Sequence, residues 1–373
     1  MSRFVIACGG TGGHLAPGIA VAEELVSRGH ECVLLVSSKG VDKRLSAKYD
    51  KLNFVKSPGK ALASPLSVFS FLFIQIHAIV FAFRLLGRNT TSVMAFGGFT
   101  STGVVVAAFL RGVPVALHEA NRNPGRAIRV LRHFAKRLYL PDGIGLSNVP
   151  ASFVHYVGYP VRKEIKKLPK LNARKEFGFE DCGKLLVVLG GSQGAASLNK
   201  WAADSAKTLC ANGISLCCVC GPDKDVPSDY ETRDNTGKPV KVSFLPFCDK
   251  MGTLMSAADI VVSRAGAGSI AEIIECEQPS ILVPYPFAAD NHQMANARYL
   301  EQQGGCVVLE QERIDGLLSE VLDLTFSDWL IERLCFNLRQ IRKDNCAATI
   351  ADDLIELGES RKKAKNVVKP KLP

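Results

Sequence analysis

The residues Gly9-Gly-Thr-Gly-Gly-His14 stand between an apolar β-type run, Phe4–Cys8, and a helical pattern, Pro17–Arg28. Backbone amides in such a turn, together with the start of a helix, bind anions such as phosphate. A histidine near a helix N-terminus has its neutral form favoured, which makes His14 our preferred general base. The alternatives are a tight structural turn, and a His14 that caps the helix or donates a hydrogen bond to phosphate.

This turn matches neither common phosphate-binding fingerprint. Read from Gly10, the dinucleotide pattern GxGxxG fails because Leu15 replaces the third glycine and no acid follows the second strand, Cys32–Val36. The pattern GxxxxGK[ST] is absent from the chain, which excludes a P-loop. Two further glycine-rich strand–helix junctions, Phe96–Ser101 and Gly190–Gly194, indicate that several phosphates bind.

A fourth junction, Ser263-Arg-Ala-Gly-Ala-Gly-Ser-Ile-Ala-Glu272, follows the predicted strand Ile260–Val262. Amides and Ser269 at the helix start can hold a diphosphate, and Glu272 can accept two hydrogen bonds from a ribose diol. A capping box formed by Ser269 and Glu272 is the alternative, and it is compatible with a phosphate site.

Amide and imidazole side chains suited to sugar hydroxyls follow the turn that starts at Val283, at His292, Gln293 and Asn296. Another polar group, His118-Glu-Ala-Asn121, closes the predicted strand Val113–Leu117. Glu119 in this group is our second candidate for the general base.

The chain carries 46 basic and 36 acidic residues, a net charge of +10, which favours an anionic partner such as a membrane or phosphate. Half of this excess lies in residues 359–373, which we expect to form a basic, flexible tail. Residues 122–137 hold six Arg and Lys and no acid, which indicates an anion-facing surface. Nucleic acid is disfavoured because no aromatic residues are interleaved with these charges.

Among the twelve cysteines, Cys217, Cys218 and Cys220 stand together in the apolar run Ile214–Cys220, and the chain has no second cluster at zinc spacing. We therefore expect buried thiols in a reducing compartment, with no metal and no cofactor.

The order of strand and helix patterns starts twice, at Phe4 and again at Leu185, which predicts an α/β fold of two tandem Rossmann-like domains with a cleft between them. We place the N-terminal domain at residues 1–160 and the C-terminal domain at 161–358. One long helical pattern, Asp328–Leu357, closes the second domain and is able to pack back on the first.

The segment Leu66–Leu86 holds 21 mostly apolar residues and would be about 31 Å long as a helix. Gln75, His77 and Arg84 argue against a membrane span. We expect one face to pack on the sheet through Val68, Leu72, Ile76, Ile79 and Phe83. A second stripe should remain exposed and contact an anionic membrane surface: Leu66, Phe69, Phe73 and Val80.

In order and type, these motifs resemble the MurG family of peptidoglycan glycosyltransferases over nearly the whole chain, Gly9 to about Leu357. The resemblance implies the glycosyltransferase-B fold and a peripheral enzyme at the cytoplasmic face of the inner membrane. It implies transfer of N-acetylglucosamine, with inversion, from UDP-N-acetylglucosamine to undecaprenyl-diphospho-N-acetylmuramoyl-peptide.

By matching motif, the resemblance assigns Thr11, Gly12 and Gly13 to the diphosphate side and Asn121 to the sugar. It assigns Arg162 and Ser192 to the nucleotide, and backbone near Cys248 to uracil. The diphosphate and ribose would lie at Ala267, Gly268, Ser269, Ile270, Ala271 and Glu272, and the sugar hydroxyls at Gln293 and Asn296. Arg264 is a further candidate for holding the leaving diphosphate.

The family's usual residues are replaced at four positions, by Phe99, Ala120, Tyr159 and Ser269. The alternatives left open are a glycolipid glycosyltransferase, a UDP-N-acetylglucosamine 2-epimerase and a non-catalytic scaffold that binds sugar nucleotides.

Overall fold

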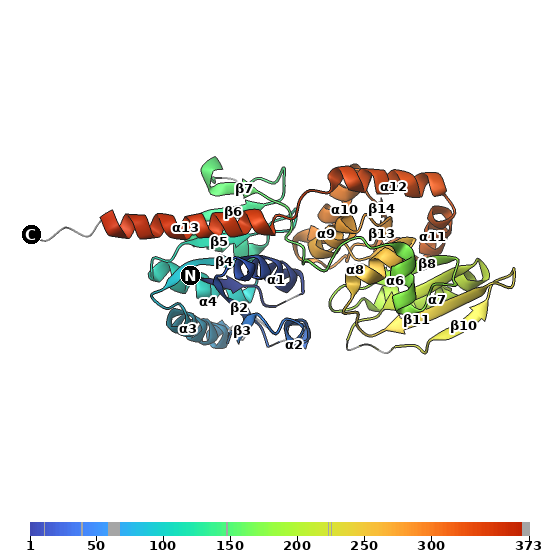
Figure 1. The fold of residues 1–373 in the computed structure, drawn as a ribbon, viewed down its shortest axis with the longest axis horizontal. Coiled ribbons are helices and arrows are strands. Elements are labelled where there is room, and N and C mark those ends of the chain that lie inside the picture. The colour runs from blue at the N-terminus through green and yellow to red at the C-terminus, as the bar shows by residue number, and fades with distance from the viewer. Residues whose placement is uncertain are drawn as a thin grey trace, which may run out of the picture. The chain divides into compact units, whose positions relative to one another are not determined.

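The structure, a computed structural model, describes residues 1–10, 12–38, 40–58, 68–146, 148–222, 224 and 226–367. The chain divides into two compact units (Figure 1). Unit 1 comprises Met1–Arg162 and the segment from Asn345 onward, and unit 2 comprises Lys163–Asp344. Each unit is built on a seven-stranded sheet, which confirms the predicted fold class of two tandem Rossmann-like α/β domains.

Unit 1 has an all-parallel sheet in the order β3-β2-β1-β4-β5-β6-β7. Its strands are β1 (Arg3–Ala7), β2 (Glu31–Val36), β3 (Asn53–Lys56), β4 (Thr90–Ala95), β5 (Val115–His118), β6 (Arg137–Leu140) and β7 (Val154–Tyr156). Its helices are α1 (Gly12–Ser27), α2 (Gly40–Ala47), α3 (Val68–Leu85), α4 (Phe99–Leu110), α5 (Arg126–Leu131) and α13 (Ala347–Val367).

Helices cover both faces of this sheet because its strands are apolar on both sides. Phe4 and Ile6 of β1 share one core cluster with α1 and α13, which lie side by side in Figure 1. Val5 and Ala7 belong to the opposite cluster, with α3, α4 and α5. Such double cover is what parallel sheets require.

Helix α13 differs from the expectation at both of its ends. The predicted pattern Asp328–Leu357 is broken after α12 (Asp328–Ile341), and Asn345 there accepts a hydrogen bond from the Ala347 nitrogen at 3.1 Å. The second half belongs to unit 1, the domain onto which this pattern was expected to be able to pack back, and the division falls after Asp344 instead of at 358. Helix α13 also continues to Val367, through most of the expected tail.

Close packing explains why α13 lies on unit 1. A Cβ atom on Gly358 would lie 2.0 Å from Thr91 Cγ2, so the helix contacts β4 directly. The Tyr139 hydroxyl donates to Asp353 Oδ2 at 2.6 Å, which fixes α13 to β6.

Unit 2 has the sheet order β10-β11-β9-β8-β12-β13-β14, parallel except for the β10–β11 pair. Its strands are β8 (Lys184–Leu189), β9 (Ile214–Val219), β10 (Tyr230–Arg233), β11 (Pro239–Leu245), β12 (Ile260–Ser263), β13 (Ser280–Leu282) and β14 (Val307–Val308). Its helices are α6 (Lys170–Phe177), α7 (Ala196–Ala211), α8 (Met251–Ala257), α9 (Ala267–Glu275), α10 (His292–Gln302), α11 (Leu317–Thr325) and α12. All twelve cysteines of the chain are free thiols, ten of them buried.

Helix α3 packs only in part through the expected face: Ile79 contacts the core, two other residues of that face do not, and the side chains of Val68 and Leu72 lie outside the described residues. Ala78 and Ala82 are buried, whereas Ile76 and Phe83, assigned to the packed face, are exposed. The reason is size, because a Cβ atom on Gly103 of α4 would lie 2.9 Å from Ala78 Cβ, and large side chains would hold the two helices apart. Among the helices of the described residues, none is long and apolar enough to cross a membrane.

Two residues of the expected exposed stripe of α3 are exposed in the structure. Phe73 is 74% exposed and Val80 is 43% exposed. Leu66 lies outside the described residues, as does the side chain of Phe69.

Candidate functional site

In each sheet the strand order reverses at one point, where successive strands begin to be added on the other side. In open α/β sheets, ligands bind at such a point, outside the carboxyl ends of the strands. In unit 1 this point lies between β1 and β4, so Gly9–Gly13 and Phe96–Ser101 flank it. In unit 2 it lies between β8 and β12, so Gly190–Gly194 and the segment from Arg264 flank it. The glycine-rich motifs therefore fall where a ligand site is expected.

The first turn of unit 1 needs glycine for close backbone contact. A Cβ atom on Gly9 would lie 2.3 Å from the Ser37 nitrogen. The two flanking loops are also bonded to each other, because Thr100 Oγ1 donates to the Gly9 carbonyl at 2.8 Å. Thr11 lies outside the described residues. Gly12 and Gly13 open α1, and the Tyr159 hydroxyl donates to the Gly13 carbonyl at 3.1 Å.

His14 lies in the first turn of α1 and is half-buried. Its imidazole faces the second glycine loop, since a Cβ atom on Gly98 would lie 3.3 Å from His14 Nδ1. The structure therefore brings the preferred base to the point between the two loops, in an environment made of backbone and a helix N-terminus.

A second histidine, His118, lies close by and was not among our predicted site residues. It is buried at the end of β5, and its Nε2 donates to the Gly158 carbonyl at 3.1 Å. The pKa of His118 is lowered to about 4, chiefly by burial and to a smaller degree by His14, while the hydrogen bond to Gly158 opposes the shift. His118 is therefore neutral at physiological pH. The sequence signal that could have identified it is the polar motif His118-Glu-Ala-Asn121, of which only Glu119 and Asn121 were chosen as site residues.

Glu119 holds the adjacent loop. Its carboxylate accepts hydrogen bonds from the backbone and side-chain nitrogens of Asn121, both at 2.9 Å, and from the Gly125 nitrogen at 2.7 Å. The side chain is 6% exposed. These three bonds fit a residue that positions Asn121 and the start of α5 better than a general base. Arg162, the last residue of this part of unit 1, is buried, with its guanidinium 3.5 Å from the Tyr49 hydroxyl.

In unit 2 the loop after β8 is equally constrained. A Cβ atom on Gly194 would lie 2.0 Å from the Cys220 carbonyl oxygen. Ser192 of this loop is exposed at the carboxyl edge of the sheet, and Cys248 is buried beyond β11.

Helix α9 begins at Ala267 with Gly266 as its N-cap, and no side chain caps it. The capping-box alternative is therefore wrong, because Ser269 lies inside the helix instead of at its cap. Residues 266–272 are all half-buried, so the N-terminal turn is accessible. Glu272 follows one turn into the helix, as expected for a ribose contact next to a diphosphate.

Arg264 joins three loops at this edge. Its Nη1 donates to the carbonyls of Val283 at 3.0 Å and Pro284 at 3.2 Å, and its Nη2 donates to Ser197 Oγ at 2.8 Å and to Gln311. The residue is 6% exposed, and burial lowers the pKa of its guanidinium. Arg264 therefore connects the loop after β12 to the loop after β13, the first turn of α7 and the segment after β14, which corresponds to a positioning role.

The sugar-site candidates also hold backbone. Gln293 Oε1 accepts from the Tyr285 nitrogen at 3.0 Å, and Asn296 Nδ2 donates to the Ala265 carbonyl at 3.2 Å. Their bonds connect α10 to the loops after β13 and β12. The described residues contain no group of three or more His, Cys, Asp or Glu that could hold a metal ion.

Two family models match this chain: the glycosyltransferase family 28 N-terminal domain over residues 4–140 and its C-terminal domain over residues 185–330. The UDP-N-acetylglucosamine–N-acetylmuramyl-(pentapeptide) pyrophosphoryl-undecaprenol N-acetylglucosamine transferase of Opitutus terrae is 50% identical over 96% of this chain and 95% of that protein. The enzyme of the same name from Nitratidesulfovibrio vulgaris is 33% identical over 98% of this chain and 100% of that protein.

Among solved structures, MurG of Acinetobacter baumannii has a TM-score of 0.70 at 23% identity, covering 95% of this chain and 100% of that one. The glycosyltransferase of kitacinnamycin has a TM-score of 0.67 at 15% identity, covering 95% and 99%. At these identities the two structures support the fold.

Proposed function

The chain belongs to glycosyltransferase family 28, and we propose that it transfers N-acetylglucosamine from UDP-N-acetylglucosamine to undecaprenyl-diphospho-N-acetylmuramoyl-peptide, a step of peptidoglycan synthesis. The observation that carries this is the 50% identity to an enzyme of that name over nearly the whole of both chains. An epimerase or a non-catalytic scaffold is disfavoured by the same identity.

Unit 2 is the donor unit in this proposal. The N-terminal turn of α9 offers amides and a positive helix end to the diphosphate, and Glu272 accepts the ribose hydroxyls. Ser192 contributes from the loop after β8, and Arg264 keeps the surrounding loops in place. Amides at Gln293 and Asn296 lie beside the sugar.

Unit 1 is the acceptor unit, with His14 as the general base. The acceptor hydroxyl attacks the anomeric carbon of N-acetylglucosamine, its proton passes to His14, and the bond to the β-phosphate oxygen of UDP breaks. Direct displacement inverts the anomeric carbon. Helix-end amides stabilise the charge that develops on the departing diphosphate.

Release of UDP that depends on the acceptor tests the proposal. We expect the purified protein to release UDP from UDP-N-acetylglucosamine only when the undecaprenyl-linked acceptor is added. Equal release without acceptor, or formation of the 2-epimer, would instead support an epimerase, and no turnover at all would support a scaffold.

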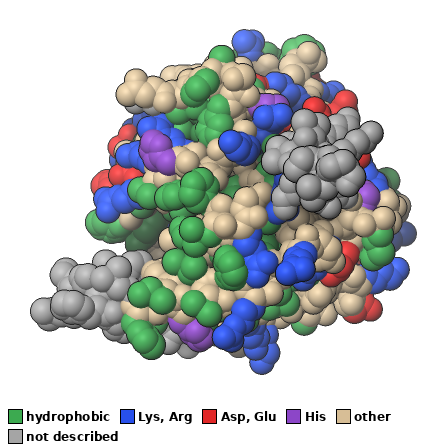
Figure 2. Space-filling view, turned by 90° about the vertical axis from the view of Figure 1, so that its left-hand side faces the viewer, with side chains coloured by type: hydrophobic (Ala, Val, Ile, Leu, Met, Phe, Trp, Pro, Cys, Tyr) green, Lys and Arg blue, Asp and Glu red, His purple; other side chains and the backbone are tan. Residues whose placement is uncertain are grey.

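An exposed apolar surface on unit 1 is our proposed membrane contact. Ile76 is 59% exposed beside Phe73 and Val80 on α3, and Phe109 and Leu110 are exposed at the end of α4. The two helices join here, since the Arg111 guanidinium lies 3.9 Å from the centroid of the Phe83 ring. Figure 2 shows this end of the molecule, with hydrophobic side chains among Lys and Arg.

Unit 1 also carries exposed basic side chains in and after the last turn of α3 and in and after α5: Arg84, Arg88, Arg126, Arg129 and Lys136. Each basic residue near an anionic lipid surface contributes about 1 kcal/mol. We therefore propose that unit 1 binds anionic lipid peripherally, at the cytoplasmic face of the inner membrane, where the acceptor lies.

Replacing Phe73 and Val80 together by glutamate is expected to abolish sedimentation with anionic liposomes, because two charges enter the apolar contact. Fold and UDP affinity should persist, since both side chains are exposed and unit 2 is unchanged. The matched control is Phe326→Glu with Trp329→Glu, two exposed aromatic residues of unit 2. Liposome binding that survives in a folded Phe73/Val80 variant would refute this contact.

A further inference from the structure

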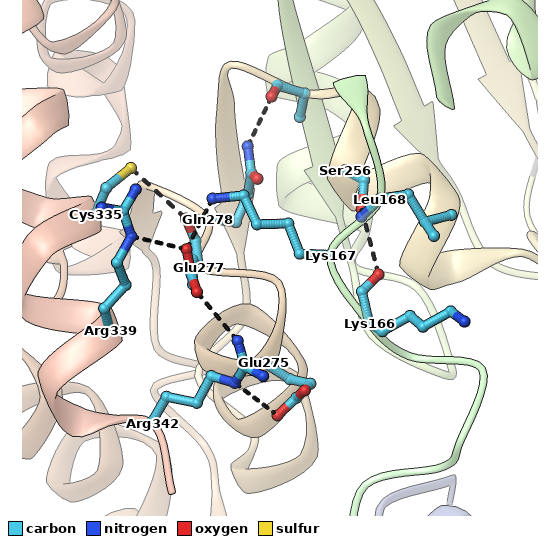
Figure 3. A network of polar contacts seen from close by, with 11 residues as sticks. Lys166, Lys167, Leu168, Ser256, Glu275, Glu277, Gln278, Cys335, Arg339 and Arg342 are labelled. Atoms are coloured by element: carbon cyan, nitrogen blue, oxygen red, sulfur yellow. Dashed lines mark hydrogen bonds and ion pairs between the residues drawn. The ribbon is translucent and has the colours of Figure 1, made fainter. Parts of the chain in front are cut away.

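Five charged residues form an ion-pair cluster in unit 2, which we call the Glu277 cluster: Lys167, Glu275, Glu277, Arg339 and Arg342 (Figure 3). Glu277 lies at its centre, in the turn between α9 and β13, with its side chain 11% exposed. Its carboxylate accepts hydrogen bonds from Lys167 Nζ at 2.8 Å, Arg339 Nε at 2.9 Å and Arg342 Nη1 at 3.1 Å.

The charges in this cluster are unequal, since three cations face two carboxylates. Arg342 Nε also lies 3.5 Å from Glu275 Oε2. Burial alone would raise the pKa of Glu277, but the bonds from Lys167 and Arg339 outweigh it and hold the pKa below its usual value. Glu277 is therefore an anion at every physiological pH, and its contacts persist.

The backbone at Glu277 has a φ of +50°, the left-handed conformation that side chains other than glycine adopt at a cost. Neighbouring bonds hold it there. Cys335 Sγ donates to the Glu277 carbonyl at 3.6 Å, and Gln278 Nε2 donates to the Ala258 carbonyl at 2.7 Å. A strained residue persists where its surroundings determine it, and such positions cluster at functional elements.

The three cations come from the two segments that connect unit 2 to unit 1. Lys167 lies in the segment that follows the division after Arg162. Arg339 lies in the last turn of α12 and Arg342 directly follows that helix, just before the division after Asp344. One carboxylate thus binds both connections.

The first connection is also seated on α8. The Leu168 nitrogen donates to Ser256 Oγ at 3.0 Å, and a Cβ atom on Gly252 would lie 2.8 Å from the Glu164 carbonyl oxygen. Figure 3 shows this contact on the side of Lys167 away from Arg339. The segment 164–168 therefore follows a defined course along unit 2.

Helix α9 links this cluster to the donor site. Its N-terminal end is the diphosphate site of the proposed function, and its C-terminal end at Glu275 is followed by the C-cap Cys276 and then by Glu277. We propose that Glu277 is a positioning residue for sugar transfer, which fixes both connecting segments to the C-terminal end of the donor helix. This inference rests on the proposed function. The N-terminal end of α9 then holds the donor, and its C-terminal end holds both connecting segments.

Limited trypsin digestion tests the anchoring directly, because the connections are rich in Lys and Arg. Glu277→Gly keeps the left-handed backbone accessible and removes all three ion pairs. We expect cleavage at Lys163, Lys166, Lys167, Arg342 and Lys343 to be faster by about tenfold or more, since protection follows local opening. Asp204→Asn, which breaks one exposed ion pair with Lys200, is the control and should change nothing. Unchanged cleavage at the connections would overturn the proposal.

Kinetics then separates positioning from general destabilisation. In Glu277→Gly we expect kcat for transfer to fall about tenfold or more, because misplaced reacting groups lower the rate of the chemical step. The Kd for UDP should not change. Glu277→Asp, which keeps the charge, should recover part of the rate. A loss of UDP affinity parallel to kcat would mean that Glu277 merely stabilises α9, and would overturn the positioning role. If the parent protein transfers no sugar but Glu277→Gly is still cleaved faster, the anchoring by Glu277 stands and the proposed function is rejected.

Discussion

Replacement of His14 by alanine is expected to lower kcat for transfer by about 10²–10⁴-fold, the usual contribution of a general base. UDP affinity should stay the same, because His14 belongs to unit 1 and the proposed UDP contacts belong to unit 2. Initial rates at saturating substrates measure the first quantity, and calorimetric titration with UDP measures the second.

The matched control is His133→Ala, an exposed histidine outside the proposed site. A kcat within tenfold of the parent in His14→Ala would mean that another group takes the proton. Glu119 is the next residue to replace. Its three accepted hydrogen bonds predict that Glu119→Gln also disturbs the loop of Asn121, so the folding of that variant must be checked first.

Replacement of Glu272 by alanine is expected to raise the KM for UDP-N-acetylglucosamine roughly tenfold to a hundredfold. The loss of hydrogen bonds to a charged group costs about 1.5–3 kcal/mol, which corresponds to that factor. Glu272→Gln should be milder because its amide oxygen still accepts a hydrogen bond.

A donor analogue makes this prediction specific. If Glu272 accepts the ribose hydroxyls, then the analogue of UDP without a 2′-hydroxyl should bind the parent more weakly, and Glu272→Ala should affect its binding less than that of UDP. Equal losses for both ligands, or an unchanged KM in the alanine variant, would remove Glu272 from the ribose site.

The strand–helix junctions were predictable from sequence because each is local. Glycine turns, apolar strands and helix starts are contiguous in the chain, so the two sheets and the places of His14, Glu272 and Gln293 followed from the pattern. The break between α12 and α13 was missed, although the apolar stripe changes face there, since the nine residues from Ile341 to Ile350 turn a continuous helix by about 180° beyond whole turns.

Long-range side-chain contacts were not predictable. Arg264 looked like a diphosphate ligand, yet its acceptors include Ser197 and Gln311, which are 67 and 47 residues away in the chain. Two residues of α3, Ile76 and Phe83, were wrongly assigned to its packed face. Side-chain size decided this, because the small Ala78 and Ala82 lie against the core in their place. The Glu277 cluster joins residues on three separate segments and has no local signature.

Mass spectrometry of the lipid product tests the central claim most directly. The purified protein is incubated with UDP-N-acetylglucosamine and undecaprenyl-diphospho-N-acetylmuramoyl-peptide, and the lipid fraction is measured over time. The account predicts that the acceptor gains the mass of one N-acetylhexosamine residue, in step with UDP release and without any gain when His14 is alanine. An acceptor of unchanged mass, with UDP-N-acetylglucosamine intact or converted to its epimer, would contradict it.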